Sequence, residues 1–534
     1  MSPPLLETRD LSLAIHGTPI LDRVSFALAP GRIFGLVGES GSGKSMTALS
    51  LMRLLPEGAE STGEILFAGQ NLLALGERAM CALRGSEIGM IFQEPMTALN
   101  PVQTIADQVA ETLIIHDRSG RRDARRIALE KLTRVGLPPD AVSPDRYPHE
   151  LSGGQRQRVA IAMAIALGPR LLIADEPTTA LDVTTQAQIL DLLKGLVGDE
   201  GMSLLLITHD LAVVAGMADR VAVMQKGKIV EEGETRTLFT RMHHPYTRQL
   251  FAASSHRPER QTRPAAEPLL TTENVLREYR LPGISLSGRA PRLRAVDHVS
   301  FTIHRGESLG LVGESGCGKS TLSRTLLGLD PIEAGRITLD GEEVHAGQHM
   351  PAHMRRRMQI VFQDPYASFD PRWTVGRLVA EPFHLLETPP EDPRAVVIEA
   401  LANVGLPAAS AGRYIHEFSG GQRQRIAIAR ALVLHPDLVI LDEAVSALDV
   451  SVRAQILDLL ADLQARLALS YLFISHDLNV VRAITDRVLV MQAGQIVEEG
   501  PTDRVFTSPR HPYTRTLLDA APQIPAQWRQ AELG

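Results

Sequence analysis

Short, mostly apolar runs recur along the chain, and each is followed at once by glycines or by polar side chains. Such runs are typical of strands that are buried on both faces of a parallel sheet. Helix-like stretches lie between them, so the pattern predicts an alternating α/β fold. The runs that carry the argument below lie at residues 33–37, 89–92, 171–174, 203–207, 309–312, 359–362, 438–441 and 472–474.

Two of these runs lead into glycine-rich loops with the same spacing. Residues 38–45 read GESGSGKS and residues 313–320 read GESGCGKS, so both fit the phosphate-binding pattern G-x-x-x-x-G-K-[ST]. Glycines let the backbone turn its N–H groups toward an anion, and the following helix N-terminus adds a positive dipole end. The pattern predicts two nucleoside triphosphate sites. Their residues are Gly38, Glu39, Ser40, Gly41, Ser42, Gly43, Lys44, Ser45, Gly313, Glu314, Ser315, Gly316, Cys317, Gly318, Lys319 and Ser320.

The repeat extends beyond the loops and divides the chain into two copies of one domain. Lys44 corresponds to Lys319 at an offset of 275, and the later motifs correspond at offsets of 270 and 267. We expect a first domain at residues 1–251, a proline-rich linker at 252–268 and a second domain at 269–534. An insertion of 11 residues falls between Arg280 and Arg292 of the second copy, where a solvated loop is expected.

Two further apolar runs end in acidic pairs, Asp175-Glu176 and Asp442-Glu443. In parallel α/β sheets, ligands bind beyond the carboxyl ends of the strands, so these side chains are expected near the nucleotide. The aspartates are suited to holding Mg²⁺. The glutamates are suited to acting as general bases or to positioning the attacking water.

Histidine and glutamine recur around the same predicted sites. His209 and His476 each end an apolar run, 33 residues after the glutamate of the acidic pair, where they would reach the γ-phosphate. Gln93 and Gln363 each follow a short strand. A neutral amide there is suited to Mg²⁺ and to the attacking water.

Each half also carries Ser-Gly-Gly-Gln in front of a long helical pattern, between the glutamine and the acidic pair. Such a helix start is a second anion-binding terminus. Since each half already has its own phosphate loop, we expect this terminus to serve the nucleotide of the other half, in a head-to-tail pair. The residues are Ser152, Gly153, Gly154, Gln155, Ser419, Gly420, Gly421 and Gln422.

Composition limits the partners and the cellular location that the chain can have. A net charge of −7 gives no support for a nucleic-acid partner. Two cysteines, Cys81 and Cys317, cannot supply a disulfide framework or a cysteine-rich metal site. The first residues do not fit a signal peptide, and no apolar run approaches the roughly 18–20 residues that span a bilayer. Any membrane role is therefore expected to fall to other chains.

In this order and in duplicate, the phosphate loop, glutamine, Ser-Gly-Gly-Gln signature, acidic pair and histidine resemble an ABC-type ATPase with two nucleotide-binding domains. The resemblance covers essentially the whole chain. Both halves end in His-Pro-Tyr-Thr-Arg, at residues 244–248 and 511–515. This is similar to the C-terminal motif of ATPases that serve dipeptide, oligopeptide and nickel importers. The chain looks like a fused form, as in the ATPases for microcin C-type peptide, murein-peptide and glutathione uptake.

The resemblance implies a fold class and a site. The fold is α/β, with two tandem P-loop NTPase domains of the RecA-like, ABC type, each with a helical subdomain and an antiparallel β subdomain. The ligands are ATP and Mg²⁺. The implied catalytic residues are Glu176, His209, Glu443 and His476. The implied metal-site residues are Ser45, Gln93, Asp175, Ser320, Gln363 and Asp442.

The resemblance also implies how the two halves cooperate. ATP at Lys44 would be closed over by the signature at Ser419, and ATP at Lys319 by the signature at Ser152. The regions after Gln93 and Gln363 would receive cytoplasmic helices of two transmembrane permease subunits. The chain would lie on the cytoplasmic face of the bacterial inner membrane, and a periplasmic solute-binding protein would be an indirect partner.

Some positions depart from the family pattern or differ between the copies. Tyr279 stands where the family stacks adenine, whereas the first copy has Ile15. The second acidic pair is followed by Ala-Val instead of Pro-Thr. Met163 stands where the second copy has Arg430, and the sequence offers no account of that difference.

The sequence favours peptide uptake as the function. Nickel or glutathione uptake stays open, because cargo choice rests with other subunits. Soluble tandem ABC ATPases that act on ribosomes or DNA, and an accessory ATPase without a transporter, are the competing classes.

Overall fold

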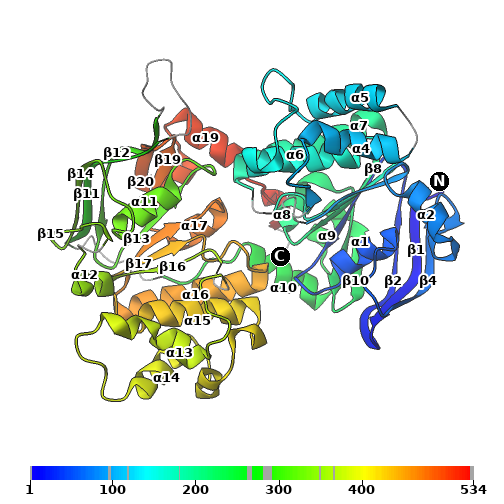
Figure 1. The fold of residues 1–534 in the computed structure, drawn as a ribbon. Coiled ribbons are helices and arrows are strands. Elements are labelled where there is room, and N and C mark those ends of the chain that lie inside the picture. Colours follow the sequence, from blue (N-terminus) through cyan, green and yellow to red (C-terminus); the bar gives the residue numbers. More distant parts are fainter. Residues whose placement is uncertain are drawn as a thin grey trace. The chain divides into compact units, whose positions relative to one another are not determined.

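The computed structural model describes residues 3–93, 98–116, 120–179, 181–260, 267–280, 292–347, 350–364 and 367–529. The chain divides into two compact units, coloured along the sequence in Figure 1. The first comprises Met1–Leu181, Thr185–Ser254 and Pro522–Gly534, and the second comprises Asp182–Thr184 and Ser255–Ala521. Helix α10 (Pro245–Ser254) continues past residue 251, where the sequence-based first domain ended. The predicted insertion lies outside the described residues, except for Arg280 and Arg292 at its ends.

A six-stranded sheet forms the centre of the first unit, in the order β10-β9-β3-β8-β7-β6. Strands β6, β7, β8, β3 and β9 are parallel, and β10 is antiparallel to β9. The predicted apolar runs form its buried strands. The bounds are β3 (Ile33–Val37), β6 (Ile88–Ile91), β7 (Leu171–Asp175), β8 (Ser203–Thr208), β9 (Arg220–Gln225) and β10 (Lys228–Glu234).

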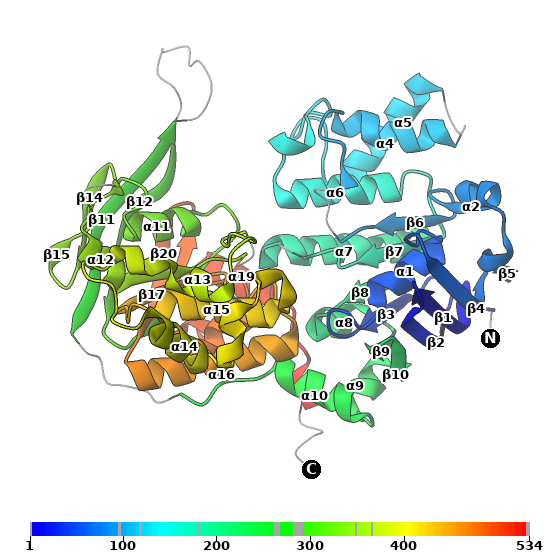
Figure 2. The ribbon, with the colours of Figure 1, turned by 60° about the horizontal axis from the view of Figure 1, so that its bottom comes forward.

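An antiparallel sheet and a helical subdomain complete the first unit. The antiparallel sheet has the order β2-β1-β4-β5, with bounds β1 (Leu6–Ile15), β2 (Thr18–Leu28), β4 (Ala59–Phe67) and β5 (Gln70–Asn71). The stacked rings of Phe26 and Phe34, 5.0 Å apart, join its β2 to the central β3. Helices α4 (Ile105–Ile115), α5 (Arg121–Arg134) and α6 (Gly153–Ala164) pack together as the helical subdomain (Figure 2).

Further helices of the first unit lie along the chain between these elements, and the first two residues of α7 are assigned to the second unit. Helix α1 follows the phosphate loop and contacts both β2 and β7. The bounds are α1 (Lys44–Met52), α2 (Glu77–Leu83), α7 (Val183–Glu200), α8 (Leu211–Met217) and α9 (Thr235–Thr240).

The second unit repeats this architecture. Its central sheet has the order β16-β17-β18-β13-β19-β20 and its antiparallel sheet the order β12-β11-β14-β15. The central strands are β13 (Ser308–Val312), β16 (Met358–Val361), β17 (Leu438–Asp442), β18 (Ser470–Ile474), β19 (Arg487–Gln492) and β20 (Gln495–Pro501). The antiparallel strands are β11 (Pro268–Arg280), β12 (Arg292–His304), β14 (Ala334–Leu339) and β15 (Glu342–Glu343).

The helices of the second unit also correspond to those of the first. Their bounds are α11 (Lys319–Leu326), α12 (Ala352–Arg357), α13 (Val375–Ala380), α14 (Pro393–Asn403), α15 (Gly420–Leu432), α16 (Val450–Leu467), α17 (Leu478–Ile484), α18 (Thr502–Thr507) and α19 (Pro512–Asp519). The predicted fold class, two tandem P-loop domains with helical and antiparallel β subdomains, is therefore confirmed.

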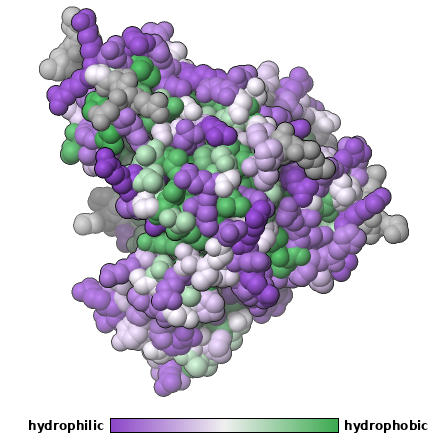
Figure 3. Space-filling view, turned by 90° about the vertical axis from the view of Figure 1, so that its right-hand side faces the viewer, coloured by the Kyte–Doolittle hydropathy of each residue, from purple (hydrophilic) through white to green (hydrophobic). Residues whose placement is uncertain are grey.

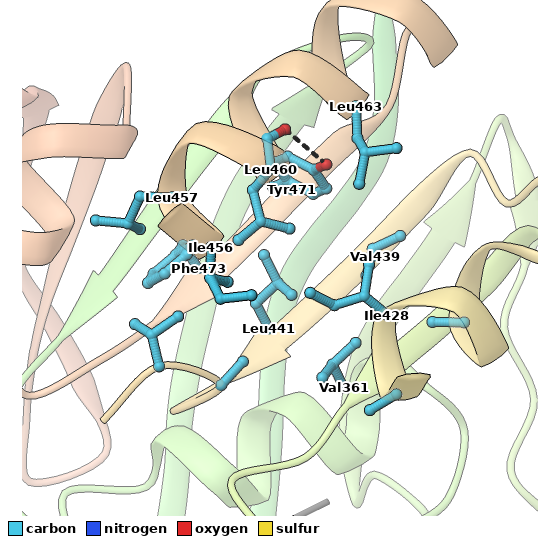
Figure 4. Close-up of a cluster of buried hydrophobic side chains, with 14 of the residues drawn as sticks. Val361, Ile428, Val439, Leu441, Ile456, Leu457, Leu460, Leu463, Tyr471 and Phe473 are labelled. Atoms are coloured by element: carbon cyan, nitrogen blue, oxygen red, sulfur yellow. Dashed lines mark hydrogen bonds between the residues drawn. The ribbon is translucent and has the colours of Figure 1, made fainter. Parts of the chain in front are cut away.

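A large apolar core lies between the central sheet and the helices of the second unit (Figure 4). Leu441 of β17 and Phe473 of β18 pack against Ile456 and Leu460 of α16, and all four are nearly inaccessible to solvent. Burying one such side chain is worth roughly 1.5–3 kcal/mol. The phenol of the buried Tyr471 donates a 3.0 Å hydrogen bond to the Leu460 carbonyl, so its polar end is satisfied.

The last described helix, α20 (Ala526–Arg529), belongs to the first unit although the second domain precedes it in the chain. It contacts α9. The indole of Trp528 is 9% exposed, with its ring 6.1 Å from that of Phe239, and Ile524 beside it is buried. The C-terminal segment therefore contributes to the core of the first unit.

No helix in the ranges given above is both long and apolar enough to cross a membrane. On the face shown in Figure 3, hydrophilic and hydrophobic side chains are interspersed.

Candidate nucleotide sites

Both glycine-rich loops join the end of a central strand to the start of a helix, as the sequence predicts. Gly43 precedes α1 with φ of 104°, and Gly318 precedes α11 with φ of 112°. This backbone conformation strongly favours glycine. Close packing adds a second reason, because a Cβ at Gly318 would lie 2.0 Å from the Ala295 carbonyl oxygen. The loops therefore keep their backbone close to neighbouring strands and open toward a ligand.

A buried lysine ammonium lies inside each loop. Lys44 Nζ donates to the carbonyls of Gly38 and Glu39 at 2.8 and 2.9 Å. Lys319 Nζ makes the same two bonds, at 2.7 and 2.8 Å, to Gly313 and Glu314. A cation held at a helix N-terminus within a glycine-rich turn forms a concavity for a polyanion such as a triphosphate.

Each phosphate loop is accompanied by an aspartate at the end of a central strand, and Asp175 is buried whereas Asp442 is half-buried. Asp175 accepts a 3.2 Å hydrogen bond from the Ser45 hydroxyl, and its burial raises the pKa of that carboxyl to about 6. Burial likewise raises the pKa of Asp442. The partner of Asp442 is Ser323, at 3.2 Å, whereas the predicted Ser320 is exposed. Carboxylate and hydroxyl oxygens around a buried charge form a donor set that suits Mg²⁺.

Glu176 and His209, which the sequence places at the same nucleotide, contact each other directly. His209 Nδ1 lies 3.1 Å from Glu176 Oε1. Glu176 Oε2 accepts from Gln93 Nε2 at 3.1 Å and from Thr179 Oγ1 at 2.9 Å. Burial of Glu176 opposes its ionisation, but the His209 bond and charge, the Thr179 bond and Lys44 lower its pKa to about 2. The carboxylate is therefore ionised at neutral pH and can only accept hydrogen bonds.

In the second acidic pair, the glutamate also contacts its histidine, but fewer side chains hydrogen-bond to its carboxylate. His476 Nδ1 lies 3.1 Å from Glu443 Oε2. The pKa of Glu443 is lowered as well, because the bond to His476 and the charges of His476 and Lys319 outweigh burial. Ser446, which corresponds to Thr179, donates instead to the Glu443 main-chain carbonyl at 2.8 Å. Gln363 is exposed.

Both glutamates have positive φ, 47° for Glu176 and 51° for Glu443. Few residues other than glycine adopt this conformation, and it is typical of functional positions held by their surroundings. The surroundings here are neighbouring strands: the Glu176 amide donates to the Ile207 carbonyl and the Glu443 amide to the Ile474 carbonyl, each at 2.9 Å. The backbone thus fixes where each carboxylate points.

The two predicted signatures start helices α6 and α15. Ser152 Oγ accepts from Gln155 N, and Gln155 Oε1 accepts from Ser152 N, which is a capping box. Ser419 and Gln422 make the same pair of bonds. The serines are exposed, so each signature presents the start of its helix to solvent within its own unit.

The tyrosine of the His-Pro-Tyr motif contacts the phosphate loop in both units, which the sequence reasoning missed. Tyr246 Oη accepts from the Glu39 amide at 3.2 Å and lies 3.2 Å from the Glu39 carboxylate. Tyr513 Oη accepts from the Glu314 amide at 3.0 Å. Both tyrosines are buried, and burial raises the pKa of the Tyr513 phenol to about 12.

A buried or half-buried glutamate of the preceding strand holds each motif in place. The Glu498 carboxylate of β20 accepts from the amides of Arg510 and His511, at 2.9 and 3.0 Å. Glu231 of β10 accepts from the corresponding amides in the first unit. The motif is thus a rigid turn that delivers a hydroxyl to the phosphate loop. The recurrence of the motif at the end of both halves was the only signal of it in the sequence.

Tyr279 lies on β11 and is engaged by charged neighbours. Its hydroxyl lies 3.1 Å from Asp330 Oδ2, and the Arg277 guanidinium lies 4.6 Å from its ring centre. Its role toward adenine stays a prediction.

Two P-loop domains, each with an acidic pair, a histidine and a helix-start signature, define a tandem nucleotide-hydrolysing protein. The family described as "ABC transporter" matches residues 21–179 and 296–446. The family described as "Oligopeptide/dipeptide transporter, C-terminal region" matches residues 230–275 and 497–533. The chain therefore belongs to the ABC transporter family and is an ATPase of that family.

Among curated relatives, "Peptidoglycan transport ATP-binding protein YejF" of Agrobacterium fabrum is 50% identical over 98% of this chain and 97% of its own length. "Glutathione import ATP-binding protein GsiA" of Pectobacterium atrosepticum is 46% identical over 99% of this chain and 91% of its own length. Among solved structures, cbiO1 from Clostridium perfringens, part of the ABC transporter complex cbiONQ, is 28% identical over 45% of this chain and 92% of that chain, with a TM-score of 0.40.

Proposed function

We propose that the chain is the ATP-hydrolysing subunit of a bacterial importer that takes up short peptides across the inner membrane. The observation that carries this proposal is the oligopeptide/dipeptide transporter region found at the end of both domains. The two relatives are named for peptidoglycan transport and glutathione import. Glutathione is a tripeptide and peptidoglycan contains peptide stems, so both names are consistent with a small peptide cargo.

In the proposed cycle, each ATP binds a phosphate loop of one domain and the signature of the other. Lys44 with Ser45, and Lys319 with Ser320, take the phosphates. The helix starts at Ser419 and Ser152 close over them from the opposite domain. The exposed, capped helix starts support this arrangement, because a helix N-terminus stabilises negative charge.

Mg²⁺ is the metal that the donor set supports. Asp175, Ser45 and Gln93 would hold it in the first site, and Asp442, Gln363 and Ser320 or Ser323 in the second. When bound, Mg²⁺ neutralises charge on the β- and γ-phosphates. Burial of Asp175 disfavours its charged form, which a nearby cation would favour again.

Glu176 and Glu443 would orient the attacking water as ionised acceptors. A carboxylate with a pKa of about 2 binds a water hydrogen well but is a weak proton acceptor, so we assign Glu176 mainly to positioning. His209 and His476 hold the carboxylates through Nδ1, which leaves Nε2 to meet the γ-phosphate.

Two permease subunits would supply the membrane-spanning part, since no described helix of this chain can span a membrane. They would dock on the segments that follow Gln93 and Gln363. This places the chain at the cytoplasmic face of the inner membrane, held there by its partners.

Glutathione is the cargo that a second observation favours, because relatives named for its import are 46% identical over nearly the whole chain. Transport assays with labelled glutathione and with a muropeptide would separate the two cargoes. Neither of the two relatives described above is named for nickel uptake or for a soluble tandem ATPase.

The central test measures ATP hydrolysis by the wild type, Glu176→Gln, Glu443→Gln and the double variant, with and without co-purified permease subunits in nanodiscs. We expect the permeases to stimulate the wild type and the double variant to lose about 100-fold or more of its rate. The single variants rank the two sites. Activity surviving in the double variant would refute the assignment of the glutamates. A wild type that neither binds nor responds to permeases would refute the importer.

A further inference from the structure

The two segments that follow the glutamines are held by different helices. We call residues 98–104 the first docking segment and residues 368–374 the second docking segment, since the proposed function places a permease helix against each. They correspond at an offset of 270, and each ends at a threonine that precedes the next helix, Thr104 before α4 and Thr374 before α13. The two docking segments therefore occupy equivalent places in the chain, but different side chains hydrogen-bond to them.

A buried glutamine of α4 fastens the first docking segment. Gln108 is 2% exposed. Its Oε1 accepts from the Asn100 amide at 2.8 Å, and its Nε2 donates to the carbonyls of Asn100 and Gln103, each at 3.0 Å. All three bonds run to the main chain of the segment, so the anchor is the helix that directly follows it. In the second unit the corresponding position is Leu378, which cannot make these bonds.

An arginine of the signature helix fastens the second docking segment. Arg430 Nη1 donates to the Ser368 carbonyl at 3.0 Å, and Nη2 donates to the Ser368 hydroxyl at 3.1 Å. Its guanidinium lies 4.6 Å from the ring centre of Phe369, and Glu381 lies 3.8 Å away. The side chain is 14% exposed, and burial lowers its pKa, with Glu381 acting in the opposite direction.

The residues around Arg430 differ between the copies as a set. Where the second unit has Ser368, Phe369 and Arg430, the first has Ala98, Leu99 and Met163. A thioether has no hydrogen-bond donor, so Met163 cannot reproduce the link. A mostly buried guanidinium is costly unless its donors are paired and its face is covered, and Ser368 and Phe369 provide both. All three interacting residues differ between the two copies, which indicates that this contact is specific to the second unit.

The link runs along one rigid element to the signature. Helix α15 extends from Gly420 to Leu432 and begins at Ser419, and Arg430 lies in its last turn. Helix α13 also packs on α15 (Figures 1 and 2). A force on the second docking segment therefore reaches Ser419 through hydrogen bonds to α15 itself, while a force on the first reaches α6 through the packing of α4, which carries Gln108, on α6.

We infer that Arg430 is a positioning residue that couples the second docking segment to the signature at Ser419, so the permeases control the ATPase mainly through the second domain. This inference rests on the proposed function. Gln108 anchors the first docking segment to α4, which packs on α6, so the hydrogen bonds of this anchor reach the signature helix only through a second helix. A permease helix docked on the second domain would then act on a signature more directly than one docked on the first domain.

Hydrogen–deuterium exchange on the purified chain tests the anchors first. We expect Arg430→Met, which installs the residue of the first copy, to speed exchange in residues 368–374 and at the start of α15. Gln108→Leu, which installs the residue of the second copy, should speed exchange in residues 98–104 and leave α6 unchanged. Unchanged exchange around Ser368 in Arg430→Met would overturn the inference.

Permease stimulation of the ATPase tests the coupling. We expect Arg430→Met to lower the stimulated rate about fivefold or more and the basal rate less than about twofold. Ser368→Ala, a milder change that uses the residue of the first copy, should give a smaller fall, and Gln108→Leu should stay within about twofold of the wild type. Equal losses in Arg430→Met and Gln108→Leu, or a loss in basal rate alone, would overturn the inference. A wild type without stimulation would instead refute the proposed function, and the inference with it.

Discussion

Replacing Tyr246 and Tyr513 by phenylalanine should weaken ATP binding while leaving the chemical step nearly unchanged. Each phenol accepts the amide hydrogen of the second residue of its phosphate loop, Glu39 or Glu314. The same residue offers its carbonyl to the loop lysine. The substitution keeps the ring in the core and removes one hydroxyl. The glutamate whose carbonyl binds the lysine then loses the hydrogen bond that its amide made to the tyrosine.

The magnitude follows from those contacts. A neutral hydrogen bond contributes about 0.5–1.5 kcal/mol net, and a bond to a charged group about 1.5–3 kcal/mol. Tyr513→Phe removes one neutral bond, for which we expect a rise in KM for ATP of about fivefold. Tyr246→Phe also removes the contact with the Glu39 carboxylate, so its effect should be the larger, about thirtyfold or more. Both should change kcat less than about twofold, because the lost support acts equally on bound substrate and transition state.

Steady-state ATPase kinetics and titration of each variant with a fluorescent ATP analogue provide the assay. Tyr471→Phe is the matched control, since it removes the hydroxyl of an equally buried tyrosine that bonds a helix carbonyl away from the loop. It should lower thermal stability and leave KM unchanged. The reasoning is refuted if both motif variants bind ATP like the wild type, or if Tyr471→Phe raises KM as much as they do.

Two other predictions concern stability. The folded-state pKa of Asp175 is raised from 3.8 to about 6, so the chain is stabilised by its protonation below pH 3.8 and loses that stabilisation as pH rises through 6. Asp175→Asn should therefore raise the free energy of unfolding by about 1–3 kcal/mol at pH 7.5 in EDTA, and it should abolish ATP hydrolysis. In thermal melts near pH 4 the variant should be no more stable than the wild type. An equal gain in stability at both pH values would contradict the ionisation of Asp175 as its cause. Trp528→Ala should lower the stability of the first unit by about 3 kcal/mol in calorimetry, whereas Gln527→Ala, an exposed neighbour on α20, should not; equal effects would mean that the indole is not buried against Phe239.

The strands and loops of the nucleotide sites could be predicted from the sequence because their constraints are local. A buried parallel strand needs a continuous apolar run, as at residues 171–174, and a phosphate loop needs glycines at fixed spacing. The places of Glu176 and His209 at the ends of apolar runs could also be predicted, whereas their direct contact follows from the neighbouring order of β7 and β8 in the sheet.

Contacts that depend on side-chain reach could not be predicted in the same way. Asp442 meets Ser323, one helical turn beyond Ser320, and only the rotation of α11 decides which hydroxyl is nearer. The bonds of Gln108, and one of the two bonds of Arg430, end on main-chain atoms that any residue carries, so the residue types alone do not reveal them. The approach of Tyr246 to Glu39 spans 207 positions and needs the complete unit.

The assignment of α20 to the first unit has a consequence for the history of the chain. The two halves carry the same motifs in the same order, so the chain is a joined pair of related ATPase domains, and such a fusion would at first be reversible. Once Trp528 had packed against Phe239, cutting the gene between the domains would leave the first product without a segment of its own fold. The first unit then depends for its folding on residues that follow the second domain in the chain. A single cut between the domains would no longer yield two complete ATPase domains.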